Sequence, residues 1–313
     1  MPFKASFTCL WCGTTHATRS GDDLEGWAQL CPDCIGKAGD NGFLRYRLHQ
    51  AFRERSASRG GAVAPGAVAE GSRTGAVAVA AATQEVDHDL GRAMVDYYEA
   101  RAPEYDDWYL RRGRFERGAI HDAAWNAELD AAGRWLDTLP WSGEIVELAA
   151  GTGWWSPLLA SRGELSLYDA APAALDRARE RLVAHGLRAH LHVRDAWADP
   201  DREVDGLFMG FWLSHVPRER LAEFLAICRR WLKPGGRLAF IDSLADAASG
   251  ATDHPAPADD LAVRRLDDGR EFTIVKVFYP PDELRAALDA AGFSDLELTT
   301  TGRFFILGTS TAA

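Results

Sequence analysis

The stretch Ile145-Val-Glu-Leu-Ala-Ala-Gly-Thr-Gly153 decides the fold of this chain. An apolar run ends in an acid, two glycines follow, and a helical pattern begins, which predicts a strand, a tight turn and a helix. Glycine lets a ligand approach bare backbone, and a helix N-terminus offers unpaired N–H groups. Two later apolar runs end in Asp169 and Asp195. Since an acid at a strand end suits ribose hydroxyls, Glu147, Asp169 and Asp195 together predict a cofactor that contains a nucleoside.

Apolar runs and helical patterns alternate over the middle of the chain. We expect strands near 144–149, 164–169, 189–194, 205–210 and 236–242, and helices near 154–162, 172–185 and 217–232. This alternation predicts an α/β fold with a parallel sheet covered on both faces and ligands bound at the carboxyl ends of its strands. In the tail, Asp267-Asp-Gly269 predicts a hairpin turn into the run Glu271–Phe278.

Residues 88–310 resemble a class I S-adenosylmethionine-dependent methyltransferase. The matching pieces are Glu147-Leu-Ala-Ala-Gly-Thr-Gly153, Leu167-Tyr-Asp169, Arg194-Asp-Ala-Trp197, Leu213-Ser-His-Val-Pro217 and Trp231-Leu-Lys-Pro-Gly-Gly236. Ala149 stands where the family often has its first glycine, and Trp154 where a third small residue is common. The resemblance implies a Rossmann-like, doubly wound and mostly parallel sheet, with a terminal antiparallel strand pair near 294–300 and 303–309. It also implies S-adenosylmethionine as the cofactor.

The matched positions imply how the cofactor is held. They assign its amino-acid end to Gly151 and Gly153, its amino group to Glu147, the ribose hydroxyls to Asp169, and the adenine to Asp195 and Ala196. The alternative for each acid is a solvated carboxylate at a strand end. Methyl transfer from a sulfonium is an in-line displacement, so the protein must mainly align the acceptor with the methyl group and exclude water.

Candidate catalytic residues lie on either side of this motif. Tyr98 and Tyr105 belong to segment 97–109, which resembles the family's N-terminal lid, and rings over a sulfonium attract it by roughly 0.5–2 kcal/mol. Core packing is the alternative for both. His215 follows the fourth strand and could act as a base, since its ordinary pKa is about 6.5, whereas a structural histidine is the alternative. Tyr98 and His215 are therefore the catalytic candidates.

The tail insertion carries several polar side chains. They are Arg264, Arg265, Arg270, Lys276 and Tyr279. If the insertion covers the pocket, these groups suit an anionic or polar substrate, and if it does not, they belong to a solvated hairpin.

Four cysteines near the N-terminus form two CxxC pairs, Cys9-Leu-Trp-Cys12 and Cys31-Pro-Asp-Cys34, with 18 residues between them. This spacing predicts a structural zinc ribbon whose ligands are Cys9, Cys12, Cys31 and Cys34. Such a short segment has too little core to fold alone, and zinc could contribute roughly 10–16 kcal/mol. A redox dithiol pair or disulfides are the alternatives.

Composition divides the chain into three parts. We expect a zinc-ribbon-like domain with a trailing helix over 1–55, a flexible linker over 56–84, and the methyltransferase domain over 85–313. The net charge of −11 disfavours broad binding to nucleic acid, although a local basic patch is compatible with it. No apolar segment approaches the roughly twenty residues of a membrane span, and no secretion signal is evident, so we expect a cytoplasmic protein without a membrane partner.

Three functions fit these features. The first is an enzyme that transfers a methyl group from S-adenosylmethionine to a small molecule. The second is an RNA methyltransferase that docks through the ribbon. The third is a non-catalytic sensor of the cofactor, or a scaffold, whose ribbon binds a protein partner.

Overall fold

The computed structural model of the protein describes residues 6–8, 15–17 and 90–313. The chain divides into two compact units, Met1–Arg92 and Ala93–Ala313. In the first unit, β1 (Ser6–Thr8) pairs antiparallel with β2 (Thr15–Ala17). The predicted zinc ligands and the predicted linker lie outside the described residues, so the zinc ribbon stays a prediction; the ligands concerned are Cys9, Cys12, Cys31 and Cys34.

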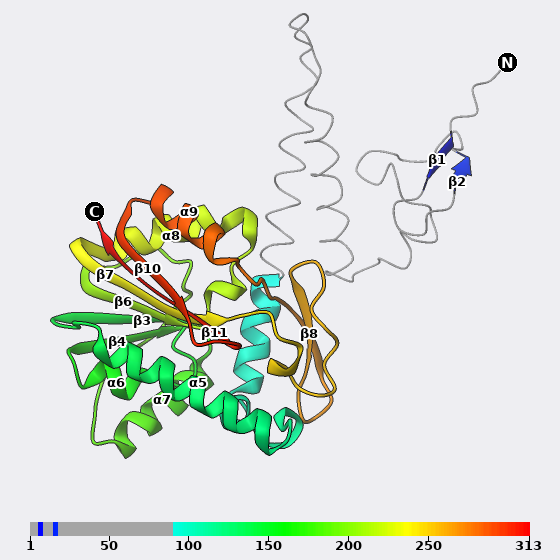
Figure 1. The fold of residues 1–313 in the computed structure, drawn as a ribbon, viewed down its shortest axis with the longest axis horizontal. Helices are drawn as coiled ribbons and strands as arrows, with labels where there is room; N and C mark the ends of the chain where they lie inside the picture. The colour runs from blue at the N-terminus through cyan, green and yellow to red at the C-terminus, as the bar shows by residue number, and fades with distance from the viewer. Residues whose placement is uncertain (1–5, 9–14, 18–89) are drawn as a thin grey trace, which may run out of the picture. The chain divides into compact units, whose positions relative to one another are not determined.

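A seven-stranded sheet forms the centre of the second unit (Figure 1), and its strands stand in the order β10-β11-β7-β6-β3-β4-β5. Their bounds are β3 (Glu144–Leu148), β4 (Glu164–Asp169), β5 (His190–Val193), β6 (Val204–Gly210), β7 (Leu232–Ser243), β10 (Phe293–Thr300) and β11 (Phe305–Ala312). Strands β3 to β7 run parallel, whereas β11 is antiparallel to both β7 and β10. The predicted Rossmann-like sheet with a terminal antiparallel pair is confirmed.

Helices cover both faces of this sheet. They are a helix over 90–101, α4 (Asp106–Leu110), α5 (Ala119–Thr138), α6 (Ser156–Ala160), α7 (Pro172–Ala184), α8 (Leu221–Trp231) and α9 (Pro281–Ala290), with short 3-10 turns η1 (Gly113–Phe115), η2 (Leu213–His215), η3 (Arg218–Arg220) and η4 (Ala247–Ser249). Figure 1 shows α8 and α9 on one side of the sheet and α5, α6 and α7 on the other. Among the described residues, no helix is long and apolar enough to cross a membrane.

Apolar side chains at helical spacing fix α5 on the sheet. Trp125, Leu129, Ala132 and Leu136 recur every three or four residues, which places them on one stripe, and all four are buried. They belong to a core cluster that also contains Phe305 of β11, and the Trp125 and Phe305 rings lie 4.8 Å apart. Packing of these side chains therefore fixes α5 against β11.

The turn after β3 depends on left-handed backbone. Ala149, Gly151 and Gly153 have φ angles of 50°, 54° and 70°. A Cβ on Gly153 would lie 2.7 Å from the Cβ of Ala178 in α7, so a glycine is required there for the turn to pack on that helix. Ala149 adopts the left-handed conformation although the family often has glycine at this position.

A second, two-stranded sheet stands beside the helix over 90–101 (Figure 1). It is a hairpin of β8 (Leu261–Arg265) and β9 (Glu271–Val275), and Gly269 in its turn has a φ of 88°. The predicted hairpin turn is confirmed. The hairpin is not solvated along its length, since Leu261 and Ile274 are buried while Arg265 and Arg270 are exposed.

Candidate active site

Asp169 lies at the carboxyl end of β4 and binds the glycine turn. Its two oxygens accept the N–H groups of Gly151 and Ala171, both at 2.8 Å. A carboxylate has about four acceptor positions, so two of them stay open for hydroxyl groups. Burial raises the pKa of Asp169 to about 6 against these two hydrogen bonds, and the charge of Asp195 adds to the rise.

Glu147 is enclosed at the carboxyl end of β3. Its side chain is 1% exposed, and the Ser156 hydroxyl at the start of α6 donates to Oε2 at 2.6 Å. Burial raises its pKa to about 8, opposed by the hydrogen bond from Ser156 and assisted by the charge of Asp169. The charge of Asp169 acts on Glu147 and that of Asp195 acts on Asp169, so the parallel strands bring the three acids within electrostatic reach at one edge of the sheet.

Asp195 and Ala196 follow β5 at the same edge. Asp195 is exposed, and its Oδ1 accepts the N–H of Trp197 at 2.9 Å, while Ala196 is buried. The Trp197 ring packs edge-on against Phe224, and the Arg220 guanidinium lies 3.9 Å above it. Asp195 therefore offers an accessible acceptor beside an apolar position.

Tyr105 and the helix α4 that follows it cover the glycine turn. A Cβ placed on Gly151 would lie 3.9 Å from the Tyr105 ring, so this tyrosine lies directly over the turn. Thr152 donates to Asp106 at 2.7 Å, and Arg181 of α7 forms an ion pair with the same carboxylate. These bonds attach α4 to the turn. Gly151 thus faces Tyr105, whereas Gly153 faces α7.

Tyr98 and His215, 117 residues apart in sequence, are joined by a hydrogen bond of 2.7 Å between the hydroxyl and Nε2. Nδ1 lies 2.6 Å from the carbonyl oxygen of Val275 and can only donate there, so in the neutral ring Nε2 accepts from Tyr98. Burial lowers the pKa of His215 well below its ordinary value, and the Lys276 charge adds to this. Burial likewise raises the pKa of Tyr98 well above its usual range.

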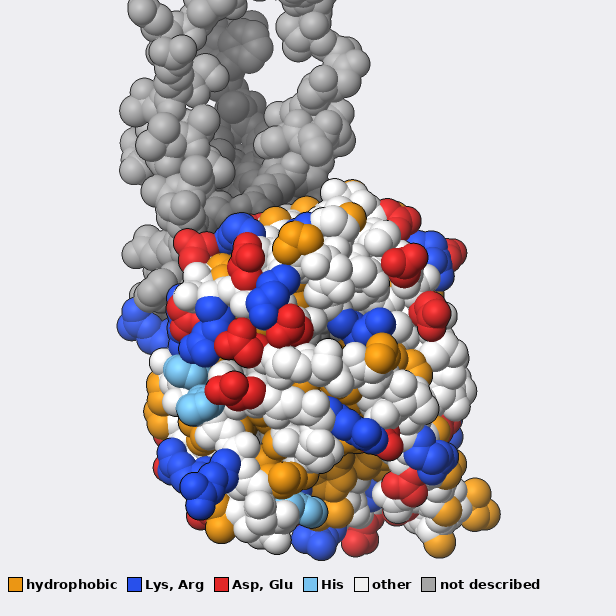
Figure 2. Space-filling view, turned by 90° about the vertical axis from the view of Figure 1, so that its left-hand side faces the viewer, with side chains coloured by type: hydrophobic (Ala, Val, Ile, Leu, Met, Phe, Trp, Pro, Cys, Tyr) orange, Lys and Arg blue, Asp and Glu red, His pale blue; other side chains and the backbone are white. Residues whose placement is uncertain are grey.

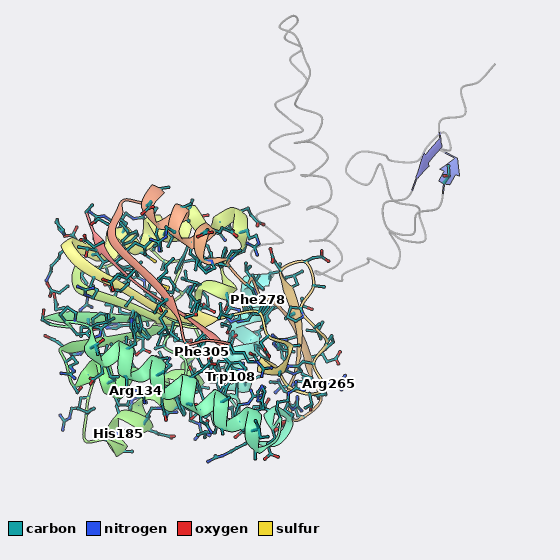
Figure 3. The ribbon with its side chains drawn as sticks, in the orientation of Figure 1. Trp108, Arg134, His185, Arg265, Phe278 and Phe305 are labelled. Carbon is teal, nitrogen blue, oxygen red and sulfur yellow. The ribbon has the colours of Figure 1, made fainter. Side chains whose placement is uncertain are left out.

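This pair faces a cavity of about 600 Å³. One part of its wall is aromatic and comprises Tyr98, Tyr105, Trp108, Phe115, Phe211 and Phe278. Another part carries cations, namely Arg101, Arg117, Arg264 and Lys276. Figure 3 shows Trp108 and Phe278 on the side of the unit that holds the β8–β9 hairpin, well away from His185 at the end of α7.

Several wall residues were not foreseen from the sequence, among them Arg101 and Phe211. Arg101 lies within the aromatic lid segment, and its guanidinium stands 4.5 Å above the Tyr105 ring. Phe211 directly follows β6 and has a φ of 60°, a strained conformation for a bulky residue that often marks a functional site. In the sequence, Arg101 could have been noticed as a single arginine among tyrosines, and Phe211 as an aromatic residue directly after a buried strand.

The described residues fit S-adenosylmethionine. Asp169 keeps acceptor capacity for the ribose, and Gly151 leaves backbone accessible below Tyr105. The rings of Tyr98 and Tyr105 lie 5.9 Å apart between the turn and the cavity, which suits a sulfonium. This edge of a Rossmann-like sheet, with a covered turn and an adjoining cavity, defines a methyltransferase of class I.

The comparisons with known proteins agree with this class. Residues 145–236 match the family model described as a methyltransferase domain. Two solved structures, titled "DhpI-SAH complex structure" and "DhpI-SAM-HEP complex", each share 30% sequence identity with this chain at a TM-score of 0.56. The matches cover 71% of this chain and 97% and 98% of those chains. The chain belongs to the S-adenosylmethionine-dependent methyltransferases.

A more distant structure shares the fold alone. The PH0226 protein from Pyrococcus horikoshii OT3 is 15% identical at a TM-score of 0.50, and the match covers 66% of this chain and 98% of that one. No curated protein matches the sequence significantly.

Proposed function

We propose that the protein methylates a small molecule bound in the cavity, and that Tyr98 and His215 remove the proton of the acceptor. The observation that supports this most directly is the Tyr98–His215 hydrogen bond in the wall of a cavity that Tyr105 joins to the glycine turn. The cavity, about 600 Å³, is of a size typical for a small-molecule site.

Each residue has a separate task in this proposal. Asp169 holds the ribose, Asp195 and Ala196 border the adenine, and Gly151 allows the amino-acid end to approach the backbone. Tyr105 covers the turn and excludes water. When bound, S-adenosylmethionine supplies a methyl group activated by the positive charge on its sulfur. Alignment of reacting groups in such a closed site can contribute roughly 7–11 kcal/mol.

The proposed proton transfer from the acceptor uses the hydrogen bond between Tyr98 and His215. The Tyr98 hydroxyl donates to Nε2 of His215, so it can take the proton of an acceptor O–H or N–H as it passes its own to Nε2. The lone pair left on the acceptor would then form the bond to the methyl carbon as the carbon–sulfur bond breaks and leaves a neutral thioether. The Val275 carbonyl holds the Nδ1–H throughout and keeps the ring in position.

The face of the protein in Figure 2 carries Lys and Arg side chains interspersed with Asp and Glu. A nucleic-acid backbone is bound by clustered cations rather than by such a mixture. This distribution favours a small acceptor over RNA on that face.

The test begins with cofactor binding by calorimetry. We expect S-adenosylhomocysteine to bind the wild-type chain and Asp169→Asn to bind it roughly ten- to hundredfold more weakly, because the amide loses a charge-assisted bond to a hydroxyl. Asp205→Asn, which removes a carboxylate bound to Lys233 and to the backbone of Glu144, is the matched control. Equal affinities of the Asp169 variant and the wild type would contradict the ribose assignment.

A further inference from the structure

We propose that the acceptor carries an oxyanion group, which binds in the cavity to Arg264 and Lys276 with Arg101 beside them. This inference rests on the proposed function, because it concerns the acceptor of the same site. It assigns a chemical class to a substrate that the fold alone does not specify.

The charge of the cavity wall is opposite to that of the protein. The whole chain has a net charge of −11, yet the described wall residues include four Arg or Lys side chains and one carboxylate, Asp246. Asp246 is already engaged, since it accepts from the Arg303 guanidinium at 2.6 Å and from the N–H of Ala248 at 2.7 Å. The wall thus has an excess of positive charge that its own side chains leave uncompensated.

Among the described residues, neither Arg101 nor Arg264 forms an ion pair with a carboxylate, and Glu104 acts on Arg101 only through its charge. The Arg101 guanidinium lies over aromatic rings, including Tyr105 at 4.5 Å and Tyr97 at 5.5 Å. Arg264 donates to the carbonyl oxygen of its neighbour Val263 at 3.2 Å, and burial lowers its pKa. Burying a guanidinium without a counter-ion is unfavourable, and a bound anion would offset that cost.

Lys276 completes the group on the β9 side. Its Nζ donates to Ser214 at 2.8 Å and to Ser243 at 3.2 Å, and the nearest carboxylate, Asp242, is 4.0 Å away. Burial lowers the pKa of Lys276 to about 8; Asp242 opposes this, whereas the charges of Arg264 and Arg101 add to it. The charges of Arg101 and Arg264 therefore act on Lys276, and all three side chains line the same cavity.

Two wall residues also contain a buried nitrogen without a hydrogen-bond partner among the described residues. Nε of Arg117 is buried and unbonded. Nδ1 of His254 is likewise buried and unbonded, while its Nε2 lies 3.0 Å from the backbone nitrogen of Arg265 and 3.2 Å from the carbonyl oxygen of the same residue. Both nitrogens are enclosed in the wall, so the anion is assigned to Arg264 and Lys276 and not to them.

An oxyanion would also assist the proton transfer. His215 resists protonation through burial and the Lys276 charge. A negative group bound beside Lys276 and Arg264 would weaken that repulsion and make Nε2 a stronger proton acceptor. The acceptor would thus help to activate the base that deprotonates it.

The experiment uses the full chain saturated with S-adenosylhomocysteine, with inorganic phosphate, sulfate and acetate as probes. We expect at least one of these anions to raise the thermal midpoint of the wild type, whereas chloride at equal ionic strength does not. Arg264→Gln should lower the affinity for that anion roughly ten- to hundredfold, the range expected for a lost charge-assisted bond. Stabilisation by phosphate and sulfate alone would indicate a phosphoryl-type group, and by acetate alone a carboxylate.

Arg265→Gln is the matched control, because this neighbour on the same hairpin is exposed and pairs with Glu271 outside the cavity. Should Arg264→Gln fail to fold, Lys276→Gln provides the second variant. The proposal is overturned if no anion stabilises the wild type, or if Arg264→Gln and Lys276→Gln respond as Arg265→Gln does. Failure of S-adenosylhomocysteine to bind would instead refute the proposed function, so the two failures are distinguishable.

Discussion

Replacing Glu147 by Gln should stabilise the protein without its cofactor at neutral pH. Glu147 is 1% exposed and its pKa is raised to about 8, from an ordinary value of about 4.3. Because the pKa of Glu147 is higher in the folded protein, the native state at a pH between the two values keeps a proton that the unfolded chain has released. This group therefore contributes most below about pH 4, and its contribution is lost as the pH rises towards 8.

The size of the stabilisation follows from the pH range between the ordinary pKa of Glu147 and its raised pKa in the folded protein. Each pH unit across it is worth about 1.4 kcal/mol, and pH 7 lies nearly three units above the ordinary pKa, so the wild type loses roughly 3–4 kcal/mol by pH 7. Gln carries no charge at any pH and can still accept the Ser156 hydroxyl. We expect the variant to exceed the wild type by up to this amount, while S-adenosylhomocysteine binds it more weakly.

Denaturant unfolding of both proteins at pH 5, 6, 7 and 8, followed by near-ultraviolet circular dichroism, provides the measurement. The gap between their unfolding free energies should widen with pH. A gap that stays constant or narrows from pH 5 to 8 would refute the reasoning. Glu144→Gln, which changes a half-exposed acid at the start of the same strand, serves as the control.

Three other changes have defined expectations. Gly153→Ala should lower the unfolding free energy by about 1–3 kcal/mol, since its Cβ would meet Ala178 at 2.7 Å in a left-handed turn; Gly186→Ala, also left-handed but with open space around it, separates strain from crowding. Tyr98→Phe and His215→Asn should each reduce kcat by roughly a hundredfold to ten-thousandfold while the affinity for S-adenosylhomocysteine holds, and unaltered turnover would exclude the pair from proton transfer. Metal analysis of the full chain should find about one zinc, and Cys12→Ser should lose it; a variant that keeps its zinc would disprove the four-cysteine site.

The sheet could be predicted because its signals are local. Each parallel strand is a short apolar run bounded by polar residues, and the strand predicted over 164–169 matches β4 (Glu164–Asp169). The helix predicted over 154–162 is shorter in the structure, at Ser156–Ala160, because Trp154 and Trp155 still belong to the turn. β7 begins at Leu232 rather than near 236, because Leu232 pairs with Val204 before an irregularity in the ladder.

The site could be predicted only in part, because its partners are distant in sequence. The positions of Glu147, Asp169 and Asp195 could be predicted because each acid closes a short apolar run. The bond between Tyr98 and His215, by contrast, depends on how the helix over 90–101 docks, which no local pattern encodes. The location of Arg264 and Lys276 on the cavity wall likewise depends on how the β8–β9 hairpin packs, which the sequence does not indicate.

The attachment of α4 to the glycine turn has a kinetic consequence. Tyr105 covers Gly151, and Asp106 is held by both Thr152 and Arg181, so the nucleotide end of the site is closed from the side of the acceptor cavity. A cofactor that entered from the cavity side would require these contacts to open. The enzyme should therefore load its methyl donor first and release the spent thioether last.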